Sequence, residues 1–100
     1  MPEPIVVCPA AELGPGMLRA IEIDSQPVVV RNVDGRLYAI ENICPHRGGP
    51  IAEGDVADGV ITCPWHDWSF NLATGQNTMN PAAMIRLFPC RIENETVVVG

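Results

Sequence analysis

Hydrophobic and polar residues alternate along this chain in short runs separated by turn residues, which predicts strands and almost no helix. In residues 36–41, for example, Leu37 and Ala39 face one way while Tyr38 and Ile40 face the other. Two closely spaced hairpins in this half predict an antiparallel meander. The expected elements are strands at 4–7, 17–23, 27–33 and 36–41, a helical turn at 10–13, and tight turns at 14–16, 24–26 and 34–35.

Residues 42–75 interrupt this pattern and look inserted between the strands before and after them. Within the segment we expect a strand at 59–62 and a return strand at 68–71. A further loop follows at 78–83. Residues 87–92 and 96–99 then form a final hairpin across Glu93-Asn94, which should close back on the first strands. The pattern therefore predicts an all-β fold, with a base of antiparallel strands that carries a small β subdomain.

The composition agrees with one small domain of this class. One hundred residues bury a modest core without disulfide bonds. Hydrophobic residues make up 47% of the chain but aromatic residues only 5%, so the core must be aliphatic. Nine glycines and ten prolines indicate many tight turns between short elements.

The charge balance narrows the classes of partner. Six basic and twelve acidic residues give a formal net charge of −6, which disfavours nucleic acid or an anionic membrane as the partner. A partner with a basic face is favoured. The alternative is that the acidic residues only keep the protein soluble. No apolar run approaches the ~20 residues of a membrane span, and residues 1–10 lack the pattern of a signal peptide. We therefore expect a cytoplasmic location.

Two short motifs carry the candidate chemistry. Cys44-Pro45-His46 offers one thiolate and one imidazole, and Cys63-Pro64-Trp65-His66 offers the same pair after sixteen intervening residues. Two sulfurs and two nitrogens fit a dinuclear iron–sulfur cluster in which Cys44 and Cys63 bind one iron and His46 and His66 the other. A zinc site with the same four ligands is the alternative. Structural zinc sites usually pair two cysteines on one turn and two histidines on a helix, whereas each turn here is mixed, so the cluster is favoured.

Residues 44–54 (CPHRGGPIAEG) and 63–75 (CPWHDWSFNLATG) resemble the cluster-binding segments of small Rieske-type ferredoxins. The resemblance implies a Rieske-type antiparallel β-sandwich or barrel base, formed by about residues 1–42 and 76–100, and a cluster-binding subdomain at about 43–75. It also implies one [2Fe-2S] cluster per chain, ligated by Cys44, His46, Cys63 and His66. The loop at 78–83 matches by position the proline-bearing loop that covers the cluster in Rieske proteins.

The same resemblance implies a function in electron transport. The chain would be a one-electron carrier between an FAD-containing ferredoxin reductase and a terminal oxygenase of the ring-hydroxylating type. It would carry electrons without being an enzyme by itself, since it shows no carboxylate–histidine triad for mononuclear iron and no nucleotide motif. The alternative is the small subunit of an assimilatory NAD(P)H nitrite reductase. A zinc-bound interaction module is a third class. We expect a monomer.

Departures from the family's other branch are informative. Rieske proteins of respiratory and photosynthetic complexes have an additional cysteine in each turn, and a disulfide joins these two cysteines. The matching positions here are Gly49 and Trp65. That branch also has hydroxyl donors where this chain has Trp68 and Phe70. The chain is therefore similar to the soluble, low-potential branch.

Several other residues carry expectations of their own. Small side chains at three glycines are expected to let backbone amides approach the cluster sulfides. These are Gly48, Gly49 and Gly75. The two remaining cysteines, Cys8 and Cys90, stand in apolar settings, where free thiols acting as small core residues are expected rather than a disulfide.

Overall fold

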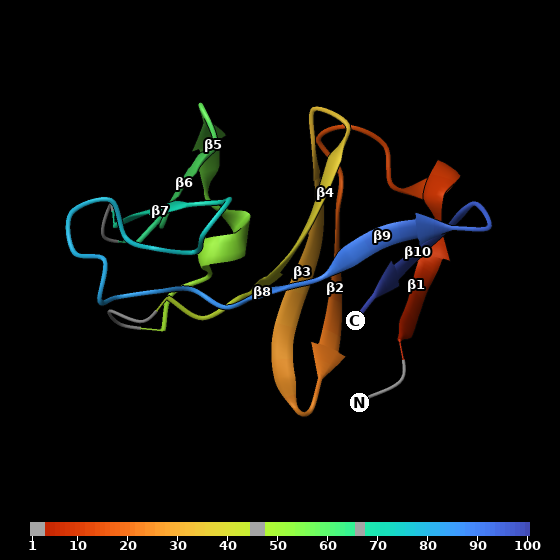
Figure 1. Ribbon diagram of the computed structural model, residues 1–100, viewed down its shortest axis with the longest axis horizontal. Helices are drawn as coiled ribbons and strands as arrows, with labels where there is room; N and C mark the ends of the chain where they lie inside the picture. Colours follow the sequence, from red (N-terminus) through yellow and green to blue (C-terminus); the bar gives the residue numbers. More distant parts are fainter. Residues whose placement is uncertain (1–3, 45–47, 66–67) are drawn as a thin grey trace.

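The structure is a computed structural model that describes residues 4–44, 48–65 and 68–100, and it confirms an all-β fold. Three antiparallel sheets with the strand orders β1-β10-β9, β2-β3-β4-β8 and β5-β6-β7 follow one another along the long axis of the molecule (Figure 1). The described strands are β1 (Ile5–Pro9), β2 (Leu18–Ile23), β3 (Gln26–Val33), β4 (Arg36–Glu41), β5 (Asp55–Ala57), β6 (Val60–Thr62), β7 (Ser69–Asn71), β8 (Leu87–Phe88), β9 (Cys90–Glu93) and β10 (Thr96–Val99). Two single 3-10 turns accompany them, η1 (Ala10–Glu12) and η2 (Ile51–Glu53).

The expected meander is confirmed, because β2, β3 and β4 are consecutive neighbours in one sheet. Four hairpins close through two residues that both have positive φ, as in the type I′ turns that match the twist of paired strands. The turn residues are Asp24-Ser25, Asp34-Gly35, Asp58-Gly59 and Asn94-Glu95.

The last hairpin differs from its prediction in two details. Its turn residues are Asn94 and Glu95, one position later than expected, because Glu93 pairs with Thr96 in the ladder. The expected strand at 87–92 is also two strands, β8 and β9, separated at Pro89. Proline has no N–H for a ladder, so β8 pairs with β4 and β9 turns to pair with β10. Two elements were not predicted at all, the 3-10 turn η2 and the short strand β5.

A continuous buried run in β3 explains how the sheets are held together. Val28 and Val30 face the base, where they pack with Ala39, Val97 and other residues in a core between the two large sheets. Val29 faces the opposite way and packs with Ile40, η2 and the small sheet in a second core. The strand is therefore buried on both faces, which is why its valines do not alternate with polar residues.

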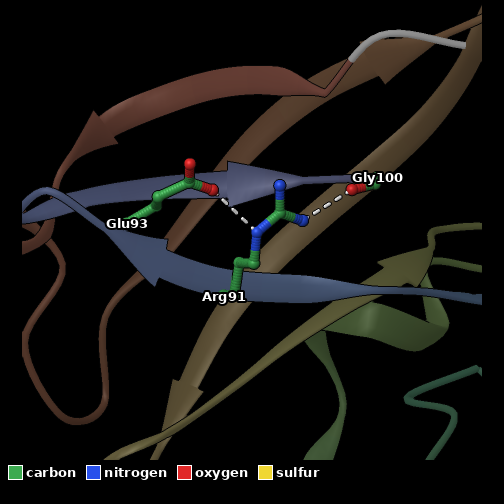
Figure 2. A network of polar contacts seen from close by, with 3 residues as sticks. All are labelled: Arg91, Glu93 and Gly100. Carbon is green, nitrogen blue, oxygen red and sulfur yellow. Dashed lines mark hydrogen bonds and ion pairs between the residues drawn. The ribbon is translucent and has the colours of Figure 1, made fainter.

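The sheet β1-β10-β9 forms the other wall of the base. On β9 the guanidinium of Arg91 donates to the Glu93 carboxylate at 2.9 Å and to the carbonyl oxygen of Gly100 at 2.7 Å (Figure 2). These contacts are exposed, so they add little to stability but join β9 to the residue that follows β10. Cys8 and Cys90 are both free thiols in this sheet, as expected, and Cys8 is buried.

The small sheet lies at one end of the molecule (Figure 1). Its three strands pair only with one another among the described strands, which supports the predicted division into a base and a subdomain at about 43–75. That division stays a prediction. Single bridges between Phe70 and Asn77 and between Gln76 and Met84 continue the pairing beyond residue 75. Within the described residues no helix is long and apolar enough to span a membrane.

Candidate metal centre

The first candidate ligand segment begins just after β4. Cys44 is buried, with 1% of its surface exposed. Its N–H donates to the carbonyl of Gly49 at 2.8 Å, and its own carbonyl accepts from the N–H of Gly48 at 2.7 Å. These two hydrogen bonds fold the segment back on itself, so the backbone on either side of residues 45–47 is held in a closed loop.

The second candidate ligand segment is the loop of the β6–β7 hairpin. Cys63 follows β6 directly and is fully buried. Its N–H donates to the carbonyl of Trp68 at 2.8 Å, which continues the ladder above the pair Thr62–Ser69. The Thr62 and Ser69 hydroxyls lie 3.0 Å apart and reinforce the same pair. The hairpin therefore fixes the backbone of Cys63 within a regular sheet.

The fold brings the two cysteines into one hydrophobic cluster. Cys44 and Cys63 belong to the second core, together with Ile51, Ile61 and Phe70. Gly49 connects the two segments directly, because a β-carbon built on it would lie 3.0 Å from the Cys63 sulfur. The two cysteines of the predicted ligand set are thus buried in one core, with Gly49 of the first loop beside the Cys63 sulfur.

The other half of the predicted set lies outside the described residues. His46 and His66 stand next to the described ends of the two loops, at residues 45–47 and 66–67. Their role as iron ligands stays a prediction. Trp65, which precedes His66, is 65% exposed.

The expected role of the glycines, to let backbone amides approach the cluster sulfides, stays a prediction. The N–H of Gly75 donates to the Asn71 carbonyl at 2.6 Å, and the N–H of Gly48 donates to that of Cys44. Both amides thus donate to backbone carbonyls. Gly49 is the glycine whose missing side chain makes room for a candidate ligand atom.

The expected third loop lies beside the β6–β7 hairpin. The N–H of Thr78 donates to the carbonyl of Ser69 at 2.9 Å. Asn77 is buried, and its side-chain oxygen accepts the N–H groups of Met79 and Asn80, both at 2.8 Å. The loop is therefore organised around Asn77, and Met79 at its outer side is 90% exposed.

The three loops share an electrostatic property. Their described residues are 44, 48–50, 63–65 and 76–84, and apart from the two cysteines none of these has an ionisable side chain. The described acidic residues lie instead on the base and around β5. The described acidic side chains, which make the net charge negative, thus lie outside the described parts of the loops.

Comparison with known proteins agrees with this geometry. Residues 3–89 match the model of the Rieske [2Fe-2S] domain. The chain belongs to this family. The ferredoxin component of the alkene monooxygenase system of Xanthobacter autotrophicus is 32% identical over 100 residues, covering 98% of this chain and 81% of that protein.

Solved structures extend the likeness to the fold of the Rieske domain. A chain in the complex of reduced oxygenase and oxidized ferredoxin in carbazole 1,9a-dioxygenase superposes with a TM-score of 0.82 at 29% identity, covering 97% of this chain and 92% of that one. A putative NADH-dependent nitrite reductase small subunit from Mycobacterium tuberculosis gives a TM-score of 0.85 at 23% identity, covering 97% and 93%. The second match shows the shared fold alone.

The family assigns the cofactor. A Rieske domain holds a [2Fe-2S] cluster with two cysteine and two histidine ligands, which accepts and donates single electrons. The family match therefore favours the cluster over the zinc alternative. The chain's own contribution is a pair of buried thiols, and the described loop residues around them have no charged side chain.

Three residues near this centre escaped the sequence analysis. Arg31 and Asn42 of the base bind the backbone around η2, and Gly54 presses against Thr62. One signal was present for Arg31, since a cation interrupts the apolar run of β3. Nothing in the sequence indicated η2, so the residues that contact it were not predictable from the sequence.

Proposed function

We propose that Cys44 and Cys63 bind one iron of the [2Fe-2S] cluster and that His46 and His66 bind the other. The support for the cysteines is their burial in one core and the close approach of Gly49 to the Cys63 sulfur. The support for the histidines is their position in the two motifs, one or two residues beyond the described part of each loop. Replacing two thiolates by neutral imidazoles makes the centre less negative, which places Rieske potentials at ~−150 to +300 mV, against ~−400 mV for plant-type clusters.

In the cell, we propose, this Rieske ferredoxin carries single electrons from an FAD-containing reductase to a terminal oxygenase of the ring-hydroxylating type. The observation that carries the proposal is the likeness, over nearly the whole chain, to ferredoxin components of oxygenase systems. One of these relatives is described in complex with its oxygenase. We further propose a monomeric carrier in the cytoplasm, with neither nucleic acid nor membrane as a partner.

The loops suggest how such a carrier meets its partners. Trp65 and Met79 are strongly exposed apolar side chains on the two loops that flank β7. Exposed apolar residues of this size are typical of contact surfaces. The net charge of −6 would attract a basic partner from a distance, while these exposed apolar side chains would form a small, transient contact.

A second candidate function is the small subunit of a nitrite reductase, because a chain of that description shares the fold with a TM-score of 0.85. The two candidates differ in how they assemble. A carrier purifies alone and binds weakly, whereas a subunit stays with its large partner. Co-purification of the native chain with a large sirohaem protein would reverse our choice.

The ligand set is tested by substituting each residue and measuring the visible spectrum and the electron paramagnetic resonance signal of the reduced protein. Cys44→Ser, Cys63→Ser, His46→Ala and His66→Ala should each abolish the cluster signal, while the base stays folded. Cys90→Ser is the matched control, because this thiol lies in the base, and it should keep the full signal. A full signal in any of the first four variants would remove that residue from the set.

The carrier function is tested in a reconstituted chain of NADH, reductase, this protein and a terminal oxygenase. Electron transfer from the reductase should slow as salt rises, since the Debye length falls to ~3 Å at 1 M. Rates that stay constant from low to high ionic strength would show that the acidity has no part in docking. Failure of every oxygenase of this type to accept electrons would contradict the function.

A further inference from the structure

Arg31 reaches out of the base to the segment between the two ligand loops. It lies on the face of β3 that also presents Val29 to the second core. Its guanidinium Nη1 donates to the carbonyl oxygen of Ala52 at 3.2 Å and to that of Gly54 at 2.5 Å. Both carbonyls belong to the end of η2, where a short 3-10 turn leaves carbonyl oxygens without partners of its own.

Asn42 binds the same segment at its beginning. Its side-chain oxygen accepts the N–H of Ala52 at 2.9 Å, and its amide donates to the carboxylate of Glu53 at 2.9 Å. No local side chain caps η2, so Asn42 supplies the acceptor from the end of β4. The N–H of Asn42 donates in turn to the carbonyl of Pro27 at 2.8 Å, which anchors it to β3.

The segment that these two residues hold contacts both ligand loops. η2 begins at Ile51, directly after the loop that Cys44 opens. It ends at Glu53, and a β-carbon on the next residue, Gly54, would come 1.8 Å from the carbonyl oxygen of Thr62, the residue before Cys63. Ile51 and Ala52 are both fully buried. A displacement of η2 would therefore move both cysteine segments together.

We propose that Arg31 and Asn42 are positioning residues for the cluster, a pair of side chains on the base that hold η2 and, through it, set the separation of the two ligand loops. The inference rests on the proposed ligand set. It assigns neither residue to the irons, and both act through hydrogen bonds to the backbone of residues 52–54. Removing either contact should let residues 48–57 open more often, which exposes the cluster to loss.

The test uses the cluster-loaded protein and the variants Arg31→Met and Asn42→Ala. The first readout is amide hydrogen exchange by mass spectrometry, which does not depend on the cluster signal or on any partner. Exchange in residues 48–57 should accelerate about tenfold or more in each variant, while exchange in residues 90–99 stays unchanged. The second readout is cluster loss to a chelator, which should accelerate by a similar factor because it follows the same opening.

Two variants distinguish the loss of the Arg31 charge from the loss of the hydrogen bonds that hold η2. Arg36→Met is the matched control, because it removes the same charge from an exposed site on β4, and it should change neither readout. Asn42→Ala removes no charge, so an effect of this variant in residues 48–57 has no long-range electrostatic origin. The midpoint potential of Asn42→Ala should shift as the loops rearrange, which a merely local loss of stability would not cause.

Wild-type exchange in residues 48–57 and wild-type cluster loss in both variants would overturn the inference. Equal acceleration in residues 90–99 would also overturn it, since that result indicates general destabilisation. Failure of electron transfer to reductase and oxygenase in the wild-type protein would contradict the carrier function instead, and it would leave the exchange result intact.

Discussion

Gly49 and Cys63 lie in direct contact across the two ligand loops, with room for a hydrogen but not for a side chain between them. A β-carbon on Gly49 would come 3.0 Å from the Cys63 sulfur and 3.2 Å from the ring of Trp65. Gly49 and Trp65 are the positions that match the two disulfide-bonded cysteines of the Rieske proteins of respiratory and photosynthetic complexes. In place of a covalent bridge this chain has an indole ring packed over a glycine.

Gly49→Ala should therefore displace the second ligand loop. The added methyl group meets both the Cys63 sulfur and the ring of Trp65, so at least one must move by a few tenths of an ångström. We expect a lower iron content per chain and a loss of about 1–3 kcal/mol in the free energy of unfolding. Urea unfolding and iron analysis measure the two effects. Gly14→Ala is the control, because its methyl group meets only the Met17 sulfur at 3.9 Å.

Gly54→Ala should be more damaging, because the obstacle is backbone. The methyl group would overlap the carbonyl oxygen of Thr62 at 1.8 Å, and a carbonyl within a sheet cannot rotate away. We expect a loss of about 3 kcal/mol or more in the free energy of unfolding, together with poor cluster incorporation. A midpoint of urea unfolding equal to that of Gly14→Ala would contradict the close approach.

Asn77→Ala should loosen the third loop. The substitution leaves the N–H groups of Met79 and Asn80 without their acceptor, which should cost about 2 kcal/mol in the free energy of unfolding. Asn77→Asp keeps an oxygen at the same place and should stay much closer to wild type. Thermal unfolding of the two variants provides the comparison. Equal losses for alanine and aspartate would show that the acceptor is not what holds the loop.

Phe70→Tyr should raise the reduction potential by tens of millivolts if the ring keeps its place. Phe70 is fully buried in the core that contains Cys44 and Cys63, so the substitution adds a hydroxyl donor to that core. A donor to sulfur stabilises the reduced, more negative centre. Phe88→Tyr adds the same hydroxyl to the base core and serves as the control. Redox titration of both variants checks the difference, and a lower potential in Phe70→Tyr would contradict it.

The thiol of Cys90 should react slowly with iodoacetamide near neutral pH. Burial raises its pKa above the ordinary value, Arg91 opposes this, and Cys8 adds to it. A raised pKa means less thiolate at a given pH, so the alkylation rate should keep rising as the pH increases beyond the ordinary thiol pKa. Arg91→Gln removes the opposing charge and should slow the reaction further. Peptide mass spectrometry at several pH values follows it, and a rate equal to that of the unfolded chain would exclude the shift.

The sequence predicted the sheets well because alternation and turn chemistry are local. The predicted pair Asp34-Gly35 adopts positive φ and sets the register of its hairpin. The cysteine positions were also local information, carried by two motifs. Contacts such as Arg31 with Ala52 join residues 21 positions apart, and no short pattern encodes them. η2 spans three residues, too few for any periodicity, and it follows directly on the segment expected to be the first ligand turn.

The three consecutive valines of β3 have a consequence for how substitutions accumulate in this chain. Val28 and Val30 pack in the base core and Val29 packs in the core that contains Cys44 and Cys63, although the three valines are neighbours in sequence. Tolerance should thus change from one residue to the next along the strand. A smaller side chain at position 29 opens a void on the side of the cysteines, whereas the same change at 28 or 30 opens one against β10. Substitutions in this one strand therefore act on two separate parts of the protein, the surroundings of the proposed cluster and the core of the base.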